Sequence, residues 1–399
     1  MLKKISKLFS ASIIAQVISF GSLPLISRMI SPEEFGLFFF YASVAGLIGG
    51  IATAKVEQLF FSYEMCYLNS LKLWSYKCVF FALSMTILLI FILFQVNVIK
   101  SMSWLLMPLG VLATASIIPH YFYLLKINNI KVISQSRVLL AVTQTVFQLS
   151  LCYFYPNHIA LLIGFFIAQL LNGLFLYIHV HNYEKTCKSL DDKHAIIDYK
   201  LLFYGVSGAS LQTLNTSFIP SFFVIFKYID LSGLVAALHR VCMVPVNLLA
   251  SSISHAVLTD YKGGTKQVIT LLWSIAFLVI LVDILCYYFI DEIGFLLVWF
   301  LGDKWQEINS IVKYFIVIYS FIFLTVIVNQ ACIAQKMQKS LMIIELVKLM
   351  VTLSAFYISS KFLRLDVLNL YSLFVSSVTI LSICFMLCVL TYKSSEKTF

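Results

Sequence analysis

The sequence predicts an all-α, multi-pass membrane protein with about 12 transmembrane helices in two six-helix bundles around a central cavity. Of its 399 residues, 61% are hydrophobic and only 12% are charged, whereas soluble domains carry roughly 25% charged residues. A soluble core of this length could not bury so much apolar surface. The net charge of +10 lies in short connections rather than in a separate basic domain, so we expect no nucleic-acid partner.

The first two apolar runs each have the length of a membrane span. Leu8–Ser27 and Phe35–Ala54 contain no charged side chain, and each run has 20 residues. A helix rises about 1.5 Å per residue and the hydrocarbon core is about 30 Å thick, so either run can cross a bilayer. The acidic break between them, Ser31–Gly36, should therefore lie in water.

Charge-poor windows place ten further spans. Two of them share Val138–Tyr183, which has 46 residues without Asp, Glu, Lys or Arg and a turn signal at Tyr155–His158. Proline removes a backbone donor and asparagine favours turns, so this run should divide there. We expect Asp291–Lys313 to be a long external connection. The other eight spans are Cys78–Ile99, Ser101–Leu125, Leu201–Phe226, Leu231–Thr259, Gln267–Ile290, Tyr314–Gln335, Ser340–Ser360 and Val367–Tyr392.

Lysine and arginine are distributed unequally between the two sides of the membrane that alternating spans define. The side of the N-terminus carries 19 and the opposite side 7. By the positive-inside rule, both termini should be cytoplasmic. A polar segment, residues 184–200, divides the spans into two halves, so we expect an N-terminal lobe at 1–190 and a C-terminal lobe at 191–399. Transporters are often built from two such halves with the substrate site between them.

Sequence features of catalysis are missing. The nine cysteines form no Cys-x-x-Cys motif and have no accompanying histidine cluster, which argues against disulfides and a metal site. No P-loop motif occurs, and no connection is long enough for an extramembrane catalytic domain. We therefore expect neither an enzyme nor a cofactor.

Two ionisable residues lie deep in predicted spans, where a charge costs about 2.5–3.5 kcal/mol and usually faces a cavity or a partner. Arg240 falls close to the bilayer midplane. One interpretation is a cationic group that lines a cavity and binds phosphate, because guanidinium makes bidentate contacts. The other is a structural ion pair with Asp283. Asp283 is equally a candidate cation site.

Other polar groups within or beside the spans are further candidates. Glu345 and Lys348 are three residues apart on one predicted helix and can pair along its face. Lys348 can also snorkel towards the interface. The span Leu201–Phe226 is unusually polar and includes Gln212 and Asn215, which indicates either a wet cavity or interhelical hydrogen bonds.

The opening of the chain resembles a known family. The order of apolar helix, Ser31-Pro32-Glu33-Glu34-Phe35-Gly36, apolar helix and Ala52-Thr53-Ala54-Lys55-Val56-Glu57 is similar to the N-terminal signature of bacterial polysaccharide repeat-unit flippases. These transport O-antigen or capsule units and belong to the multidrug/oligosaccharidyl-lipid/polysaccharide exporter (MOP) superfamily. Phe226–Val241 and Leu301–Trp305 resemble two later elements of the family. The chain departs from it in having Lys55-Val56-Glu57 where Arg-Tyr-Glu is more usual.

The resemblance implies a flippase of lipopolysaccharide biosynthesis in the bacterial inner membrane. It would move undecaprenyl-pyrophosphate-linked oligosaccharide by alternating access, with membrane lipid and the polysaccharide polymerase machinery as partners. The expected substrate-binding residues are Arg240, Arg28, Lys55, Gln212 and Asn215. Coupling to H+ or Na+ would involve Asp283, Glu345 and Lys348.

Two alternatives stay open. An ion-coupled multidrug exporter of the same superfamily would depend on buried acids rather than on an arginine. A membrane-embedded O-antigen polymerase or ligase usually needs a long periplasmic loop, and the short predicted loops argue against it. Arg28 and Lys55 lie at the mouths of the first two spans, where interfacial anchoring is the alternative to substrate binding.

Overall fold

The computed structural model describes residues 2–61, 63–96, 101–186, 199–216, 218–260, 265–334 and 338–362, with a few more between 375 and 383. The contacts divide the chain into two compact units, Met1–Ser210 and Leu211–Phe399. The described residues form helices and no strand, which confirms the all-α class. Eight described helices, or up to nine if one bent pair is a single span, are long and apolar enough to cross a membrane. The count of twelve remains a prediction, because most of the predicted last span lies outside the described residues.

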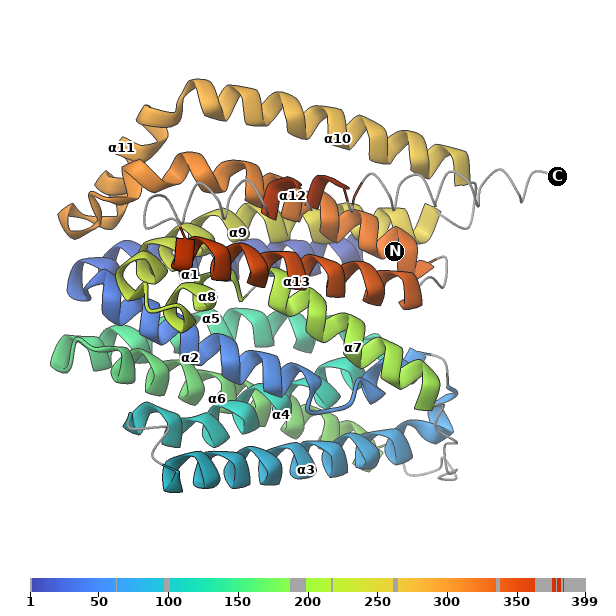
Figure 1. The fold of residues 1–399 in the computed structure, drawn as a ribbon. Helices are drawn as coiled ribbons and strands as arrows, with labels where there is room; N and C mark the ends of the chain where they lie inside the picture. Colours follow the sequence, from blue (N-terminus) through green and yellow to red (C-terminus); the bar gives the residue numbers. More distant parts are fainter. Residues whose placement is uncertain are drawn as a thin grey trace. The chain divides into compact units, whose positions relative to one another are not determined.

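Unit 1 is a bundle in which helices distant in sequence lie side by side (Figure 1). Its α-helices are α1 (Leu2–Met29), α2 (Pro32–Ile51), α3 (Leu68–Gln95), α4 (Met107–Lys126), α5 (Ile130–Phe154) and α6 (His158–Thr186). Three short 3-10 helices, η1 (Val56–Phe61), η2 (Met65–Tyr67) and η3 (Met102–Leu106), connect them. Helix α4 packs against α2, α3 and α6, while α5 packs against α1 and α6. This packing places the end of α2 beside α3 and α4.

Unit 2 is organised around the helix Ile308–Ala334, which contacts four other helices. Helix α7 (Tyr199–Thr216) spans the boundary, with its residues from Leu211 onward in unit 2. The elements after it are α8 (Ile219–Ile225), α9 (Ile229–Asp260), α10 (Thr265–Tyr288), α11 (Ile290–Leu301), η4 (Asp303–Trp305), α12 (Ile308–Ala334) and α13 (Gln338–Phe362). Helix α12 contacts α9, α10, α11 and α13. Buried apolar residues of α10 and α12, among them Val279 and Ile327, form a core together with Leu341 of α13.

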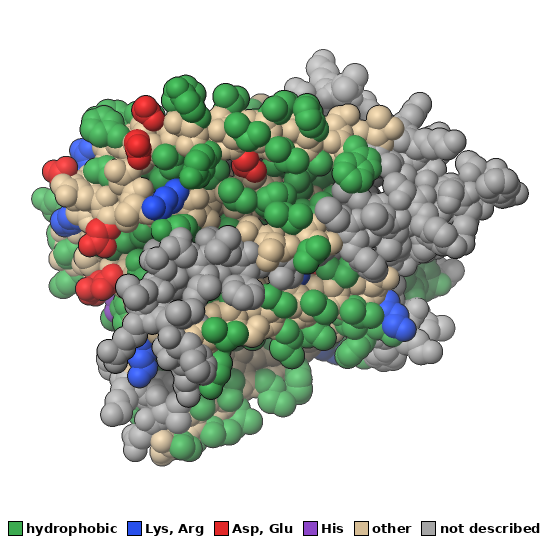
Figure 2. All heavy atoms as spheres, turned by 45° about the horizontal axis from the view of Figure 1, so that its top comes forward, with side chains coloured by type: hydrophobic (Ala, Val, Ile, Leu, Met, Phe, Trp, Pro, Cys, Tyr) green, Lys and Arg blue, Asp and Glu red, His purple; other side chains and the backbone are tan. Residues whose placement is uncertain are grey.

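The outer faces of the helices are apolar. On α3, Phe80 and Phe81 are 72% and 63% exposed, and on α10 Phe277 and Leu278 are 65% and 60% exposed. In Figure 2, hydrophobic side chains cover much of the visible surface of the helices. Such surfaces are suited to lipid, so the structure agrees with a multi-pass membrane protein.

Two predicted segments differ from the structure. The predicted span Leu201–Phe226 is divided into α7 and α8, because Pro220 at the start of α8 has no N–H to continue the preceding helix. The predicted connection Asp291–Lys313 contains α11, which is bent by 77° from the preceding helix. Asp291 and Glu292 occupy the first turn of α11, where negative charge favours a helix start.

Candidate functional site

The Ser-Pro-Glu-Glu motif begins α2 and connects it to α6. The Ser31 hydroxyl accepts a 3.4 Å hydrogen bond from the backbone N–H of Glu34, and Pro32 opens the helix. The Oε2 atom of Glu34 accepts a 2.6 Å hydrogen bond from the backbone N–H of His158 and lies 2.6 Å from Nδ1 of the same residue. The motif therefore has a structural role within unit 1.

The segment after α2 is a tight turn around a buried carboxyl group. Ala54 and Lys55 have φ angles of 49° and 57°, so two successive non-glycine residues adopt the left-handed region. Thr53 donates a 2.7 Å hydrogen bond to Oε2 of Glu57, and both residues are buried. The Lys55 ammonium lies 3.8 Å from Oε1 of Glu57. The turn thus holds a lysine–glutamate ion pair at the end of α2.

The predicted site residues of unit 1 occupy different surroundings. Lys55 is 19% exposed at its side chain and already has Glu57 as a partner. Arg28 lies in the last turn of α1 and is exposed. Both positions agree with their placement at the ends of the first two spans, and the role of either residue in substrate binding remains a proposal.

Unit 2 contains a buried polar cluster, which we call the Glu345 cluster: Glu345, Lys348, Asn329 and Asn215. Asn215 on α7 donates from Nδ2 to Oε2 of Glu345 at 2.6 Å and to its backbone oxygen at 2.8 Å. Asn329 on α12 donates to Oε1 at 3.3 Å, and Lys348 Nζ lies 3.3 Å from the same atom. Three helices thus converge on one carboxylate.

The charged residues of the Glu345 cluster are buried, so their charges must be compensated within the protein. Glu345, Asn329 and Lys348 are only 1%, 2% and 4% exposed. The predicted pairing of Glu345 with Lys348 is confirmed. The alternative, in which Lys348 snorkels towards the interface, is not what the structure shows, because Lys348 is buried and its ammonium lies beside the carboxylate of Glu345. A buried charge is stable only when it is paired and hydrogen-bonded, and this one has three donors.

The two amides of the cluster each retain an unused acceptor. Among the described residues, Oδ1 of Asn215 and Oδ1 of Asn329 are buried and have no hydrogen-bond partner. Their NH2 groups face the carboxylate, since a carboxylate accepts hydrogen bonds and repels an amide oxygen. The carboxylate of the cluster therefore has its hydrogen-bond donors, whereas the two amide oxygens have none among the described residues.

Arg240 lies on α9 and makes none of the hydrogen bonds described for the Glu345 cluster. It is partly buried, and among the described residues its Nη1 atom is buried without a hydrogen-bond partner. Its neighbour His239 is buried against the ring of Tyr319 on α12. Among the described residues, no ion pair joins Arg240 to Asp283, whose carboxylate accepts a hydrogen bond from Ser320. Arg240 thus retains donor capacity within a predicted span.

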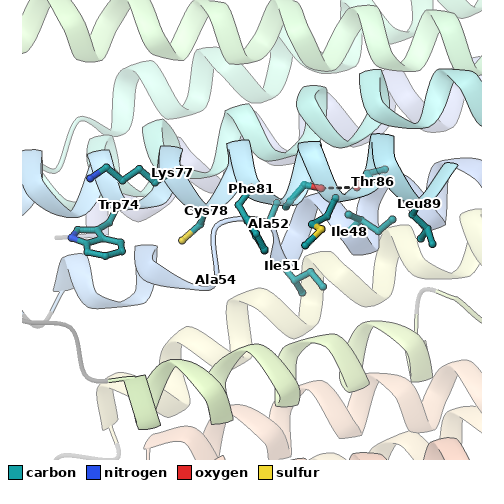
Figure 3. A pocket seen from close by; sticks show the side chains of 12 residues that line it. Ile48, Ile51, Ala52, Ala54, Trp74, Lys77, Cys78, Phe81, Thr86 and Leu89 are labelled. Carbon is teal, nitrogen blue, oxygen red and sulfur yellow. Dashed lines mark hydrogen bonds between the residues drawn. The ribbon is translucent and has the colours of Figure 1, made fainter. Parts of the chain in front are cut away.

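Each unit also has an apolar pocket. The pocket of unit 1, of about 590 Å³, lies between the end of α2 and α3; in Figure 3, Trp74 and Lys77 occupy one end of it, near Ala54. The pocket of unit 2, of about 500 Å³, lies among α9, α10, α11 and α12 and includes Ser320 in its wall. The eight predicted site residues are all described, and none of them lines either pocket.

Comparison with known proteins gives matches in structure only. No protein-family model matches the chain, and no curated protein sequence matches it. The eukaryotic MATE transporter AtDTX14 is 15% identical, with 100% of this chain and 99% of that chain covered and a TM-score of 0.53. An outward-facing multidrug resistance MATE family transporter of the MOP superfamily is 13% identical, with 99% and 96% covered and a TM-score of 0.61. A Vibrio cholerae MATE transporter is 12% identical, with 99% and 98% covered and a TM-score of 0.56.

The chain has the fold of the MATE transporters. At 12–15% identity these matches establish the fold alone, and both the MOP superfamily and the polysaccharide flippase family remain predictions. All three of these matched proteins are MATE transporters by name.

Within the MATE fold, the structure brings three of the predicted residues together and leaves the others apart. Asn215, Glu345 and Lys348 form the Glu345 cluster with Asn329, which sequence reasoning missed. An amide inside the apolar run of α12 was the available signal for Asn329. Gln212 is partly buried on α7, and among the described residues its side chain makes no hydrogen bond to the cluster.

Proposed function

We propose that the chain is a membrane transporter that works by alternating access. The observation that carries this proposal is the MATE fold, shared over nearly the whole chain with a transporter in outward-facing form. A multidrug resistance MATE family transporter in inward-facing form also matches, with 10% identity, 97% and 95% coverage and a TM-score of 0.52. Since the fold is known in both forms, alternating access is a suitable mechanism: the protein exposes its site to one side of the membrane and then to the other.

Multidrug export is the substrate class that the structural neighbours favour. The names of the matched proteins include multidrug resistance transporters, and the fold alone is compatible with that activity. Fold does not determine substrate, because different functions are built on one architecture through local changes in the site. Asp283, which is only partly buried, is the candidate acid for a cationic drug or for coupling to H+ or Na+.

A second candidate, the flipping of lipid-linked oligosaccharide, is favoured by the charges in the spans. Among the described residues, the buried carboxyl groups are those of Glu57 and Glu345, and each has a lysine partner. Arg240 retains a buried guanidinium nitrogen with no partner among the described residues. A cation with free donors suits the pyrophosphate of undecaprenyl-linked oligosaccharide better than it suits a cationic drug.

Two assays in bacterial hosts separate these candidates. The chain is expressed in a strain whose polysaccharide flippase is deleted and in a strain whose drug exporters are deleted. Restored surface polysaccharide without drug resistance would support flipping across the inner membrane. Drug resistance without polysaccharide would support export, and the lack of both at normal protein levels would contradict both.

Arg240 is the residue to change in whichever assay responds. For flipping, Arg240→Ala should abolish surface polysaccharide, and Arg240→Lys should retain part of it because a positive charge remains. Lys313→Ala is the matched control, since Lys313 is an exposed cation at the start of α12. Full polysaccharide with Arg240→Ala at normal protein levels would remove Arg240 from the mechanism.

A further inference from the structure

The pocket of unit 1 is a groove between α2 and α3 that opens to the outside of the bundle, and we call it the α2–α3 groove. Phe81, Met85 and Leu89 of its wall are exposed. Ala52 and Ala82 also line it, and both pack into a small cluster that residues of α3 and α4 share. Because these two side chains are short, they leave a hollow between the helices, and in a membrane that hollow faces lipid.

The α2–α3 groove has the length and the lining that suit a hydrocarbon chain. In Figure 3, Trp74 and Lys77 lie at one end of it and Leu89 lies at the other. Leu89 follows Lys77 by twelve residues on α3, which is about 18 Å of helix. One leaflet of a hydrocarbon core that is about 30 Å thick has nearly this depth. The Thr86 hydroxyl in the wall donates a 2.8 Å hydrogen bond to the backbone oxygen of Ala82, so it needs no partner in the groove.

The end of the groove at Lys77 carries a positive charge that no carboxylate neutralises. Lys77 is exposed, and its ammonium lies 5.4 Å from the centre of the Trp74 ring. Among the described residues it has no ion pair, whereas Lys55 and Lys72 of the same unit each pair with a glutamate. Tryptophan and lysine are residues that lie at the headgroup level of a bilayer. The polar end of the groove is therefore suited to a negatively charged headgroup.

We propose that the α2–α3 groove binds a phospholipid with an anionic headgroup, which places one acyl chain between α2 and α3 and its phosphate beside Lys77. The apolar wall accepts the chain of any phospholipid, so selection among headgroups depends on the lysine. A zwitterionic lipid carries its own cation beside its phosphate and gains less from Lys77 than an anionic lipid does. Basic pockets between membrane helices bind anionic headgroups in this way. The site does not depend on what the protein transports.

A comparison of two lipids with identical chains tests the role of Lys77. The full-length protein, purified in detergent, is titrated with phosphatidylglycerol or phosphatidylcholine, and the first bound lipid is counted by native mass spectrometry. Phosphatidylglycerol should bind about fivefold more tightly, as expected for one lysine beside an anionic headgroup. Lys77→Ala should abolish this preference, and Lys77→Glu should reverse it because like charges repel.

The matched control for these variants is Lys313→Ala. Lys313 is also exposed, and its ammonium lies 5.0 Å from the ring centre of Tyr314, but it lines neither pocket. Lys313→Ala should therefore retain the full preference for phosphatidylglycerol. The proposal is overturned if the original protein binds the two lipids equally, or if Lys77→Ala keeps the preference.

A second set of variants and ligands tests the groove itself. Ala82→Leu partly fills the groove and should weaken the binding of both lipids, whereas Ser84→Leu, at an exposed position of α3 outside the lining, should weaken neither. If Ala82→Leu does not fold, phosphatidylglycerol with six-carbon chains serves instead and should bind the original protein more weakly than the long-chain lipid.

Two further results would overturn the proposal by assigning the α2–α3 groove to another occupant. Glycerol 3-phosphate has the phosphate but no chains, so it should not compete with phosphatidylglycerol; equal competition would make Lys77 a site for free phosphate. A dimer that Ala82→Leu dissociates would show that a second copy of the chain covers the groove.

Discussion

The hydroxyl of Thr53 donates a 2.7 Å hydrogen bond to the carboxyl group of Glu57, and both residues are shielded from solvent. Lys55 lies between them in sequence and places its ammonium 3.8 Å from the other carboxyl oxygen. The backbone reverses within these five residues by using two left-handed positions. The conspicuous Ala-Thr-Ala-Lys-Val-Glu segment is thus first of all a structural unit that ends α2 and begins η1.

Thr53→Val tests the hydrogen bond to Glu57. Valine has nearly the shape of threonine but cannot donate, so the buried carboxyl group loses one partner and stability should fall by about 1–3 kcal/mol. The measurement is the apparent melting temperature of the purified protein, followed by tryptophan fluorescence. Thr86→Val is the matched control, because Thr86 is buried and donates at 2.8 Å only to Ala82 O of its own helix. An equal loss of stability in the two variants would show that the hydrogen bond to Glu57 contributes no more than a hydrogen bond within a helix.

Ala54→Gly tests the strain of the turn. Ala54 has a φ of 49°, a conformation that costs an L-residue about 1–2 kcal/mol and that glycine adopts freely. Relief of that strain should outweigh the greater unfolded-state entropy of glycine, about 0.4–1 kcal/mol, so the melting temperature should rise. Ala52→Gly is the control, since Ala52 has a φ of −58° and gains nothing from glycine. A melting temperature that falls in both variants would contradict the strain.

The sequence predicted the spans well where charge marks their ends. The break at Ser31 and Pro32 was found because an acidic run separates two apolar ones. The start of α3 was missed: a charge-free window begins at Cys78, whereas the helix begins at Leu68. Lys72 is accepted inside the helix because it pairs with Glu184 of α6, a partner 112 positions away that no local pattern reveals.

In the candidate site, too, local sequence patterns do not reveal partners that are distant in sequence. The spacing of Glu345 and Lys348 predicted their pairing, because residues three apart share a helical face. The convergence of Asn215 and Asn329 on that carboxylate depends on how α7, α12 and α13 pack, and is not encoded in any local spacing. A polar residue in an apolar span indicates that some partner exists, and only the packed structure identifies the partner.

Gly49→Ala tests the close approach of α2 and α4. A Cβ atom at Gly49 would collide with the hydroxyl oxygen of Thr114 and lie 3.3 Å from the backbone nitrogen of Ala115. Overpacking of this kind should lower stability by about 1–3 kcal/mol, seen as a lower melting temperature of the purified protein. Gly50→Ala is the matched control on the same helix, because a Cβ there meets nothing within 4 Å.

The control variant Gly50→Ala should even stabilise the protein, since alanine is favoured over glycine in a helix by about 1 kcal/mol. Adding Thr114→Ala to Gly49→Ala removes the atom nearest to the new Cβ and should recover part of the loss, as coupled neighbours do in a double-mutant cycle. Two outcomes would contradict this: equal melting temperatures for Gly49→Ala and Gly50→Ala, or no rise in the melting temperature of Gly49→Ala when Thr114→Ala is added. In either case the contact between the two helices does not depend on glycine. A selective loss at Gly49 would show that the small-residue run of α2 serves helix packing at this one position.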